Sequence, residues 1–309
     1  MTGTPVYFPE RTEMRDAARI PGGSMNERSI SVRNGMFEVD VLEGGSGDPL
    51  LFLHGISGLE WTPLLEQLSI GHTVIAPRTP GFGESTGTEN LDDIHDLVIF
   101  YLDLLDQLGL REIPLVGHSL GGMFAAELAA AQPDRFSHVT LASPFGLWDE
   151  ANPVADLFAM ALPDLARAMY ANEKSEVAVA VATAPQARMT EVDPETEHGQ
   201  ATIKYLIERA KSMSTAAKYL WPIPNRGLAK RLHRVRQPSL VIWGERDGIV
   251  PPVYAEHFAA QMTNASTHIV PAAAHMVVDE QPQIVAGLID SLLSRKIHTN
   301  SLVGAKGAL

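Results

Sequence analysis

Short apolar runs recur along the chain and are separated by stretches with helical periodicity. The runs at 50–53, 113–116 and 239–243 have the length of a strand, and their largely unbroken apolar character is typical of strands that helices cover on both faces. The stretch at 91–108 repeats apolar residues at helical spacing. The pattern therefore predicts an α/β fold with a mostly parallel sheet and strands at 29–34, 36–42, 50–53, 72–76, 113–116, 138–142, 239–243 and 266–270.

The alternation stops between residues 146 and 236, where the pattern contains helices and proline breakers but no strand. Helices are predicted at 154–160, 162–171, 173–184, 202–210 and 214–219. A helical insertion between two parallel strands is expected to lie over the carboxyl ends of the strands, where such sheets place their sites. We therefore predict an α/β core at 27–145 and 237–296, a helical cap (lid) at 146–236, an N-terminal arm at 1–26 and a C-terminal tail at 297–309.

Composition narrows the function classes. The 309 residues include no cysteine, which excludes disulfides, thiolate metal sites and cysteine nucleophiles. The formal net charge of −13 argues against nucleic acid or an anionic membrane as a partner. No apolar stretch reaches the ~20 residues that span a bilayer, and the first residues do not resemble a secretory signal, so a cytoplasmic location is expected. We predict a small-molecule substrate without a metal or other cofactor, and the sequence leaves a homodimer open.

The stretch Gly117-His118-Ser119-Leu120-Gly121 lies between a short apolar run and an alanine-rich run with high helix propensity. A G-x-S-x-G sequence in this strand–turn–helix context predicts a nucleophile elbow. Such a turn needs glycine on both sides of the serine, and its strained backbone places the hydroxyl clear of the sheet. Ser119 is therefore the predicted nucleophile, and the Leu120 N–H is one predicted donor of an oxyanion hole.

The loop that follows the third predicted strand begins with His54-Gly55. In an enzyme of this plan that loop supplies the second oxyanion donor, which here is the N–H of Ile56. An alternative interpretation is that the glycine only permits a sharp exit from the sheet.

An acid and a base are predicted after the last two strands. Asp247 lies in a turn after the strand at 239–243 and is preferred to Glu245, which is closer to the strand end and can pair with Arg246. Among the eleven histidines, His275 alone falls in the loop after the final strand. The histidine would accept the serine proton, while the carboxylate would hold the far ring nitrogen and stabilise the imidazolium.

With these motifs the chain resembles the α/β-hydrolase superfamily, and the resemblance covers about residues 27–296. It implies an eight-stranded, mostly parallel sheet with helices on both faces and a helical cap inserted after strand 6, and a triad in the chain order Ser, Asp, His. The matching motifs are His54-Gly55, Pro80-Gly-Phe-Gly-Glu-Ser85, Gly117-His-Ser-Leu-Gly-Gly122, Trp243-Gly-Glu-Arg-Asp247 with Val250-Pro251, and His275.

Within that superfamily the Pro-Gly-Phe-Gly-x-Ser loop and the cap resemble carboxylesterases and the meta-cleavage-product (carbon–carbon bond) hydrolases. The latter typically have asparagine before the nucleophile and tryptophan after the base, where this chain has His118 and Met276. An aspartate common before the Pro-Gly-Phe-Gly loop is replaced by Arg78. The preferred function is therefore a serine hydrolase that cleaves a small, largely apolar acyl ester through an acyl-enzyme.

Two alternatives stay open. One is a carbon–carbon bond hydrolase of the meta-cleavage-product type. The other is a non-hydrolytic α/β-hydrolase protein, which would be a lyase, a cofactor-free oxygenase or a ligand receptor, because the fold does not fix the function. For the substrate pocket we predict aromatic walls above Ser119, formed by Phe145, Trp148, Phe158 and Trp221.

Overall fold

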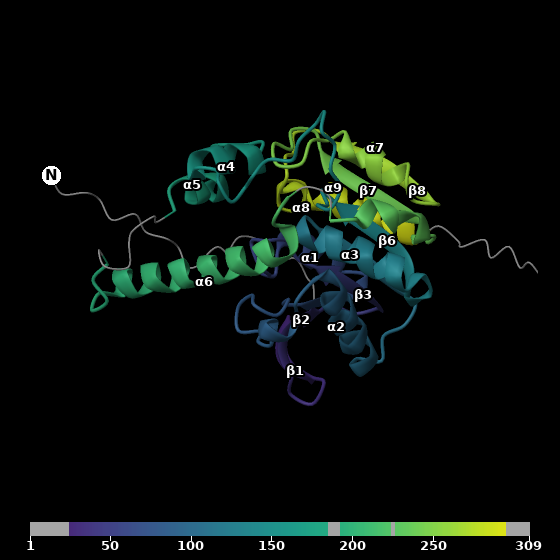
Figure 1. Ribbon diagram of the computed structural model, residues 1–309, viewed down its shortest axis with the longest axis horizontal. Helices are drawn as coiled ribbons and strands as arrows, with labels where there is room; N and C mark the ends of the chain where they lie inside the picture. The colour runs from purple at the N-terminus through teal and green to yellow at the C-terminus, as the bar shows by residue number, and fades with distance from the viewer. Residues whose placement is uncertain (1–24, 185–191, 224–225, 295–309) are drawn as a thin grey trace, which may run out of the picture.

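The computed structural model describes residues 25–184, 192–223 and 226–294. The predicted tail at 297–309 and all but the last two residues of the predicted arm at 1–26 lie outside these ranges. A single eight-stranded sheet forms the centre of the molecule, in the order β1-β2-β4-β3-β5-β6-β7-β8 (Figure 1). Its strands are β1 (Asn26–Val32), β2 (Phe37–Gly44), β3 (Asp48–Leu53), β4 (His72–Pro77), β5 (Ile113–His118), β6 (Phe136–Ala142), β7 (Ser239–Gly244) and β8 (Ala265–Val270).

The sheet is mostly parallel, as the sequence predicts. Only β2 runs against its neighbours, pairing antiparallel with both β1 and β4. Every pair from β4 through β3, β5, β6 and β7 to β8 is parallel. The carboxyl ends of β3, β5, β7 and β8 therefore lie along one edge of the sheet, and the loops that leave them meet there.

Helices cover both faces of the sheet, which explains the unbroken apolar runs of its central strands. Leu51 and Leu53 belong to one core cluster, whereas Leu50 and Phe52 belong to the other. The first cluster includes apolar residues of α2 (Ile94–Gln107), α3 (Leu120–Ala131) and α7 (Tyr254–Ala259). The second includes those of α1 (Pro63–Leu68), α8 (Val277–Glu280) and α9 (Pro282–Leu293). Short 3₁₀ turns lie at Thr88–Asn90, Pro133–Arg135, Leu228–Lys230 and Leu232–Arg234.

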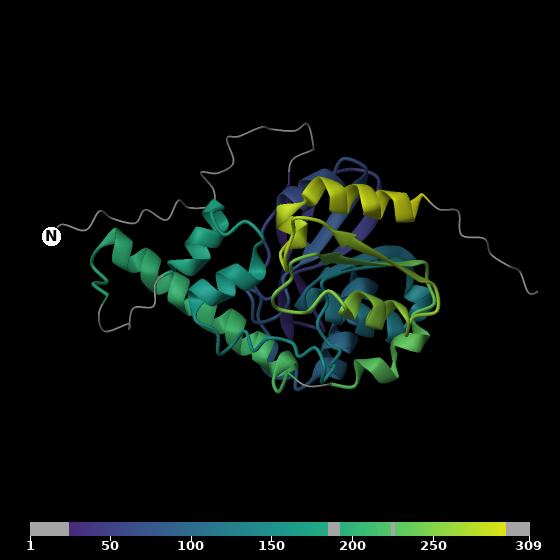
Figure 2. The ribbon, with the colours of Figure 1, turned by 90° about the horizontal axis from the view of Figure 1, so that it is seen from above.

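The insertion, residues 146–236, leaves the sheet after β6 and returns to β7. It contains α4 (Leu162–Met169), α5 (Glu176–Ala182) and α6 (Glu197–Leu220). Figure 1 and Figure 2 both show these three helices gathered at one end of the sheet, with α6 projecting away from it. None of the helices in the described part of the chain combines the length and the apolar character needed to cross a bilayer.

Two details of the insertion differ from the sequence prediction. The predicted helix at 154–160 is an irregular segment, in which the carboxylate of Asp156 accepts a hydrogen bond from the N–H of Phe158 (3.1 Å) and so competes with helix formation. The predicted helices at 202–210 and 214–219 are one continuous helix, α6, because the residues between them contain no proline or glycine. The segment 185–191 lies outside the described residues.

The carboxyl-terminal half of α6 fixes the insertion to the core. The Thr215 hydroxyl donates to the carbonyl of Gly81 (3.1 Å), and the ring of Tyr219 packs on Phe124 of α3 with centroids 5.3 Å apart. The Lys218 ammonium donates to two carbonyls of the loop that precedes α2. In the amino-terminal half Tyr205 packs against the core cluster, whereas Ile207 is 43% exposed.

An ion pair between a buried carboxylate and a partly exposed arginine joins α3 to the chain that returns from the insertion. Glu127 is 4% exposed, and its two carboxylate oxygens accept hydrogen bonds from Nε and Nη2 of Arg231 (2.7 and 2.6 Å). The hydrogen bond to Glu127 raises the pKa of Arg231. Such a bidentate pair is geometrically specific, and removing one partner leaves the other charge buried and unpaired.

Arg231→Ala is therefore expected to lower the free energy of unfolding by about 3 kcal/mol in urea denaturation. Lys211→Ala is the matched control, because Lys211 pairs with Glu208 on the exposed surface of α6 and such pairs contribute about 0.5 kcal/mol. The double variant Glu127→Met/Arg231→Met should recover most of the loss, since no unpaired charge is then buried. Equal effects of Arg231→Ala and Lys211→Ala would contradict the prediction.

Candidate active site

Ser119 stands at the sharp turn between β5 and α3. Its backbone has φ 57° and ψ −118°, a strained conformation for a residue with a side chain. The turn is held by hydrogen bonds from Ser119 N–H to the carbonyl of Ala142 (2.9 Å) and from Phe145 N–H to the carbonyl of Ser119 (3.2 Å). A Cβ on Gly117 would lie 2.3 Å from the carbonyl oxygen of Gly121, and a Cβ on Gly121 would lie 2.2 Å from the carbonyl oxygen of Leu53, so both glycines are needed for the backbones to approach.

Ser119, His275 and Asp247 form a continuous hydrogen-bonded chain. Nδ1 of His275 lies 2.9 Å from Oδ2 of Asp247, so the ring donates its Nδ1–H to the carboxylate. Nε2 is then the acceptor for the Ser119 hydroxyl, at 2.8 Å. All three side chains are almost fully buried. The structure thus brings together the three residues predicted from the sequence, with the tautomer that lets the imidazole accept the serine proton.

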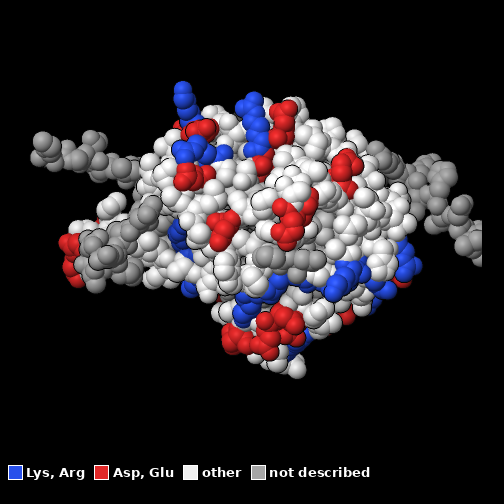
Figure 3. All heavy atoms as spheres, turned by 45° about the horizontal axis from the view of Figure 1, so that its top comes forward, with Lys and Arg blue, Asp and Glu red and all other residues white. Residues whose placement is uncertain are grey.

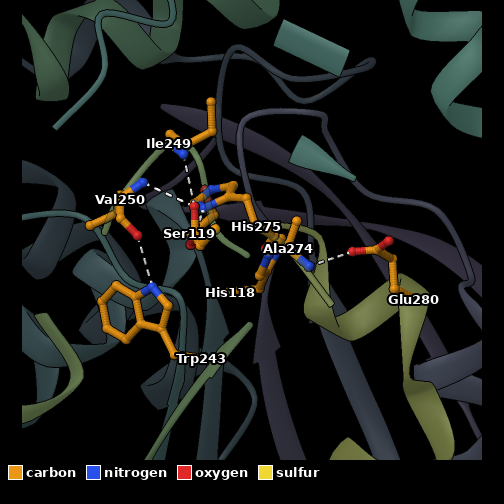
Figure 4. A network of polar contacts seen from close by, with 9 residues as sticks. His118, Ser119, Trp243, Ile249, Val250, Ala274, His275 and Glu280 are labelled. Carbon is orange, nitrogen blue, oxygen red and sulfur yellow. Dashed lines mark hydrogen bonds and ion pairs between the residues drawn. The ribbon is translucent and has the colours of Figure 1, made fainter. Parts of the chain in front are cut away.

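The turn after β7 holds Asp247 in place. Its second oxygen, Oδ1, accepts from the N–H groups of Ile249 (2.9 Å) and Val250 (3.0 Å), and the indole of Trp243 donates to the carbonyl of Val250 (2.9 Å; Figure 4). Both carboxylate oxygens are therefore used, one for His275 and one for the turn. Glu245, the alternative acid, is exposed and accepts from the N–H of Ala272 (3.4 Å).

His54 orders the loop after β3. Its Nδ1–H donates to the carbonyl of Gly55 (2.8 Å), and its Nε2 accepts from the N–H of Thr79 (3.1 Å). Thr79 in turn bonds the buried hydroxyl of Tyr101 through Oγ1 (2.7 Å). Because the Gly55–Ile56 peptide is planar and trans, fixing its carbonyl also fixes the direction of the Ile56 N–H.

The two predicted oxyanion donors lie near the elbow. A Cβ on Gly55 would be 3.1 Å from the Cβ of Ser119, so the loop after β3 contacts the nucleophile turn directly. Leu120 is the first residue of α3, and its N–H has no acceptor within the helix because it lies in the first turn. Ile56 lines the same cavity as Ser119.

His118, next to Ser119 in sequence, points away from the serine hydroxyl and donates its Nε2–H to the carbonyl of His275 (2.9 Å). Burial lowers the pKa of His118 to about 4, with a further contribution from the charge of His275. Burial also lowers the pKa of His54 to about 4, and the charge of Arg78 adds to the effect. Both rings are therefore neutral near pH 7, and the site contains no fixed positive charge from them.

A small cavity of about 60 Å³ opens beside the serine. Its lining includes Ser119 and His275 together with the loop 54–60, the chain after α4 and the start of α8. Its lining mixes apolar and polar side chains in similar numbers, and none of the lining residues is lysine or arginine. The residues that form the wall opposite the loop are Met169, Tyr170, Met276 and Val278.

The four aromatic residues predicted for the pocket are absent from this lining. Phe145 packs against the ring of His275, with centroids 5.5 Å apart, and so contacts the base from another side. Phe158 and Trp221 pack edge to face on each other at 6.1 Å, and Trp221 is 54% exposed. Trp148 is half-buried. Met169 and Tyr170 are not among the four predicted wall residues, although Tyr170 and the methionines of the insertion suit an apolar pocket by residue type. A further signal is their place at the end of an amphipathic helix of the insertion.

The acidic cluster before α2 caps that helix. The carboxylate of Asp93 accepts from the N–H groups of His95 (2.7 Å) and Asp96 (3.2 Å), which satisfies donors of the first turn. Within the described ranges, no three histidine or acidic side chains are grouped so that they could hold a metal ion.

Comparisons with known proteins agree with the fold. A family model described as alpha/beta hydrolase fold matches residues 48–282. The 2-hydroxy-6-oxo-6-phenylhexa-2,4-dienoate hydrolase of Burkholderia cepacia is 26% identical over 274 residues, which cover 85% of this chain and 92% of that protein. Among solved structures, a membrane phospholipase A has a TM-score of 0.69 at 21% identity, covering 87% of this chain and 86% of that one. The naproxen esterase of Bacillus subtilis has a TM-score of 0.62 at 18% identity, covering 88% and 92%. The chain therefore belongs to the α/β-hydrolase fold family.

Proposed function

We propose that the protein is a serine hydrolase that cleaves a small, largely apolar acyl ester. The observation that carries the proposal is the unbroken chain of hydrogen bonds from Ser119 through His275 to Asp247, beside a cavity whose lining includes apolar side chains and no lysine or arginine. A serine next to a correctly oriented imidazole is an activated nucleophile, and the neighbouring cavity can hold the group that it attacks.

The proposed reaction has two steps. The Oγ of Ser119 attacks the ester carbonyl while Nε2 of His275 takes its proton, and the imidazolium then protonates the departing alkoxide. In the second step His275 removes a proton from water, which attacks the acyl-enzyme; the bond from the acyl carbon to Ser119 Oγ breaks, the imidazolium returns its proton to that oxygen, and the acid is released. The N–H groups of Ile56 and Leu120 would stabilise the oxyanion in both steps, each contributing about 2.7–4 kcal/mol.

The charge around the cavity favours an ester over the substrate class of several relatives. The Burkholderia cepacia relative is named for a dienoate, and so is a 2-hydroxy-6-oxononadienedioate/2-hydroxy-6-oxononatrienedioate hydrolase of Comamonas testosteroni. A cationic partner would favour such carboxylates, whereas the described lining contains the acidic residues Glu60 and Asp279 and no lysine or arginine. On the face seen in Figure 3, acidic and basic side chains are interspersed.

Labelling with a fluorophosphonate probe tests the proposal. We expect one modified residue, Ser119, identified by mass spectrometry, and no labelling of Ser119→Ala, because only the activated serine attacks phosphorus. The labelled site should be protected by a short p-nitrophenyl ester. An inert Ser119 in the folded protein would overturn the proposal in favour of a non-hydrolytic protein. Faster turnover of a 2-hydroxy-6-oxo-dienoate than of any ester in a panel of graded acyl length would favour carbon–carbon bond hydrolysis.

A further inference from the structure

The chain leaving α4, residues 168–172 (the α4 exit), lies against both of the turns that follow the acid and the base. Gly248 N–H donates to the carbonyl of Ala168, and Met276 N–H donates to the carbonyl of Met169, both at 3.0 Å. A Cβ on Gly248 would lie 2.8 Å from the Cα of Ala168, so the two backbones are in direct contact. The insertion is therefore fixed, through its main chain, to the residues that immediately follow Asp247 and His275.

The carboxylate of Glu280 makes a third connection, between the α4 exit and the loop that carries His275. Its Oε1 accepts hydrogen bonds from the N–H groups of Ala171 (2.8 Å) and Asn172 (3.3 Å), on the α4 exit. Its Oε2 accepts from the N–H of Ala274 (2.7 Å), the residue directly before His275, as Figure 4 shows. Hydrogen bonds to an ionised acceptor are about twice as strong as neutral ones, and these three share one half-buried carboxylate.

The α4 exit is also a wall of the cavity, because Met169 and Tyr170 line it together with Ser119 and His275. One side chain thus contacts both the segment that bounds the substrate space and the loop that carries the base. We propose that Glu280 is a positioning residue that couples the wall of the cavity to the orientation of His275. The inference rests on the proposed function, since it assigns catalytic consequences to that base.

The physical basis of the coupling is that the two oxygens of the Glu280 carboxylate accept hydrogen bonds from two different segments. Loss of the carboxylate leaves three N–H groups to water and removes the link that Glu280 makes between the α4 exit and Ala274. The main-chain hydrogen bond from Met276 to Met169 remains, so the histidine loop is then held to the wall on only one side of His275 and can change its orientation. A displacement of about 1 Å at a catalytic group can reduce the rate by about 10²-fold.

Glu280→Gln is the most informative variant, because it keeps the shape but replaces one oxygen by an NH₂ group. The NH₂ group must face N–H donors either of the α4 exit or of Ala274, and it cannot accept a hydrogen bond from them. Only the hydrogen bonds to the remaining oxygen are therefore kept. We expect kcat/KM for p-nitrophenyl acetate to fall by about 10- to 100-fold. The preference for acetate over octanoate esters should change by about 10-fold or more as the wall shifts. In Glu280→Ala, added formate should restore part of the lost kcat by filling the gap between the three N–H groups.

Glu245→Gln is the matched control. Glu245 also accepts from a main-chain N–H of the histidine loop, that of Ala272, but its described contacts do not include the insertion. We expect its kcat/KM and its acyl-length preference to stay within twofold of the wild type. A loss of kcat/KM in Glu280→Gln without a change in acyl-length preference would overturn the coupling. An unchanged kcat/KM would overturn the positioning role altogether.

Amide hydrogen exchange tests the ties without any activity. In Glu280→Ala, the amides of Ala171, Asn172 and Ala274 should all exchange at least about 10-fold faster than in the wild type, whereas Glu245→Ala should affect only the amide of Ala272. Unchanged exchange at 171–172 would show that Glu280 does not hold the α4 exit and would overturn the inference. If the proposed function itself were wrong, a fluorophosphonate would not label Ser119 in the wild-type protein, and this result is independent of the exchange measurement.

Discussion

Ser119→Ala should lower kcat/KM for a short p-nitrophenyl ester by about 10⁴- to 10⁶-fold. His275→Ala should lower it by a similar factor, because the serine hydroxyl is a poor nucleophile unless the imidazole 2.8 Å away accepts its proton. The two groups act as one unit, so the double variant should be no slower than either single variant. Steady-state kinetics on purified variants, with subtraction of the uncatalysed rate, measure the effect.

Ser143→Ala is the control for this experiment. Ser143 is a buried serine directly after β6, and its hydroxyl has no hydrogen-bond partner among the described residues. Its loss should leave kcat/KM within about twofold of the wild type. Near-native ester hydrolysis by Ser119→Ala would show that another group attacks the ester, and the proposed mechanism would then be wrong.

Acidification from pH 6.5 to 4 should remove about 5 kcal/mol of stability through two buried histidines. The pKa values of His54 and His118 lie near 4 in the folded protein, against 6.5 in the unfolded chain. Because both pKa values are lowered on folding, the unfolded state binds more protons throughout this window. The stabilising contribution is therefore complete above pH 6.5 and falls as the pH drops towards 4, by up to about 2.7 kcal/mol for each pH unit.

Urea denaturation at several pH values between 7 and 4 measures this slope. His118→Gln keeps a donor for the carbonyl of His275 but cannot take up a proton, so the slope should fall by about half. His95→Gln, at an exposed position on α2, controls for the loss of a histidine as such. A free energy of unfolding that is constant between pH 6.5 and 5 would show that the two buried rings do not resist protonation.

Much of the site could be predicted from the sequence because its signals are local. The elbow is defined by five consecutive residues around Ser119, and its glycines are required by close backbone contacts that any homologous turn would share. Asp247 and His275 could be placed because parallel strands end at the same edge of the sheet, so the loops after β7 and β8 must meet the loop after β5. The order of the strands therefore brings residues that are far apart in the sequence together in one site.

The insertion could be predicted only in outline, because long-range contacts determine its structure. The only sequence signal for the continuity of α6 is the absence of a helix breaker. Its docking depends on Thr215 and Lys218, which contact loops more than a hundred residues earlier in the chain. The same holds for the cavity wall. Composition drew attention to aromatic residues, but Phe158 and Trp221 pack on each other, whereas Met169 reaches the cavity through its place at the end of α4.

The hydrogen bond between Ser119 and His275 joins residues 156 positions apart in the chain. Closing so large a loop is a slow event in folding. The strand that leads into the histidine loop, β8, is one of the two edge strands of the sheet. A chain that had assembled only β1 to β6 would already present the nucleophile turn, yet it would lack both of its partners. Recovery of ester hydrolysis after dilution from denaturant should therefore follow the burial of Trp243 on β7, which makes enzymatic activity a reporter of the final docking of the carboxyl-terminal strand.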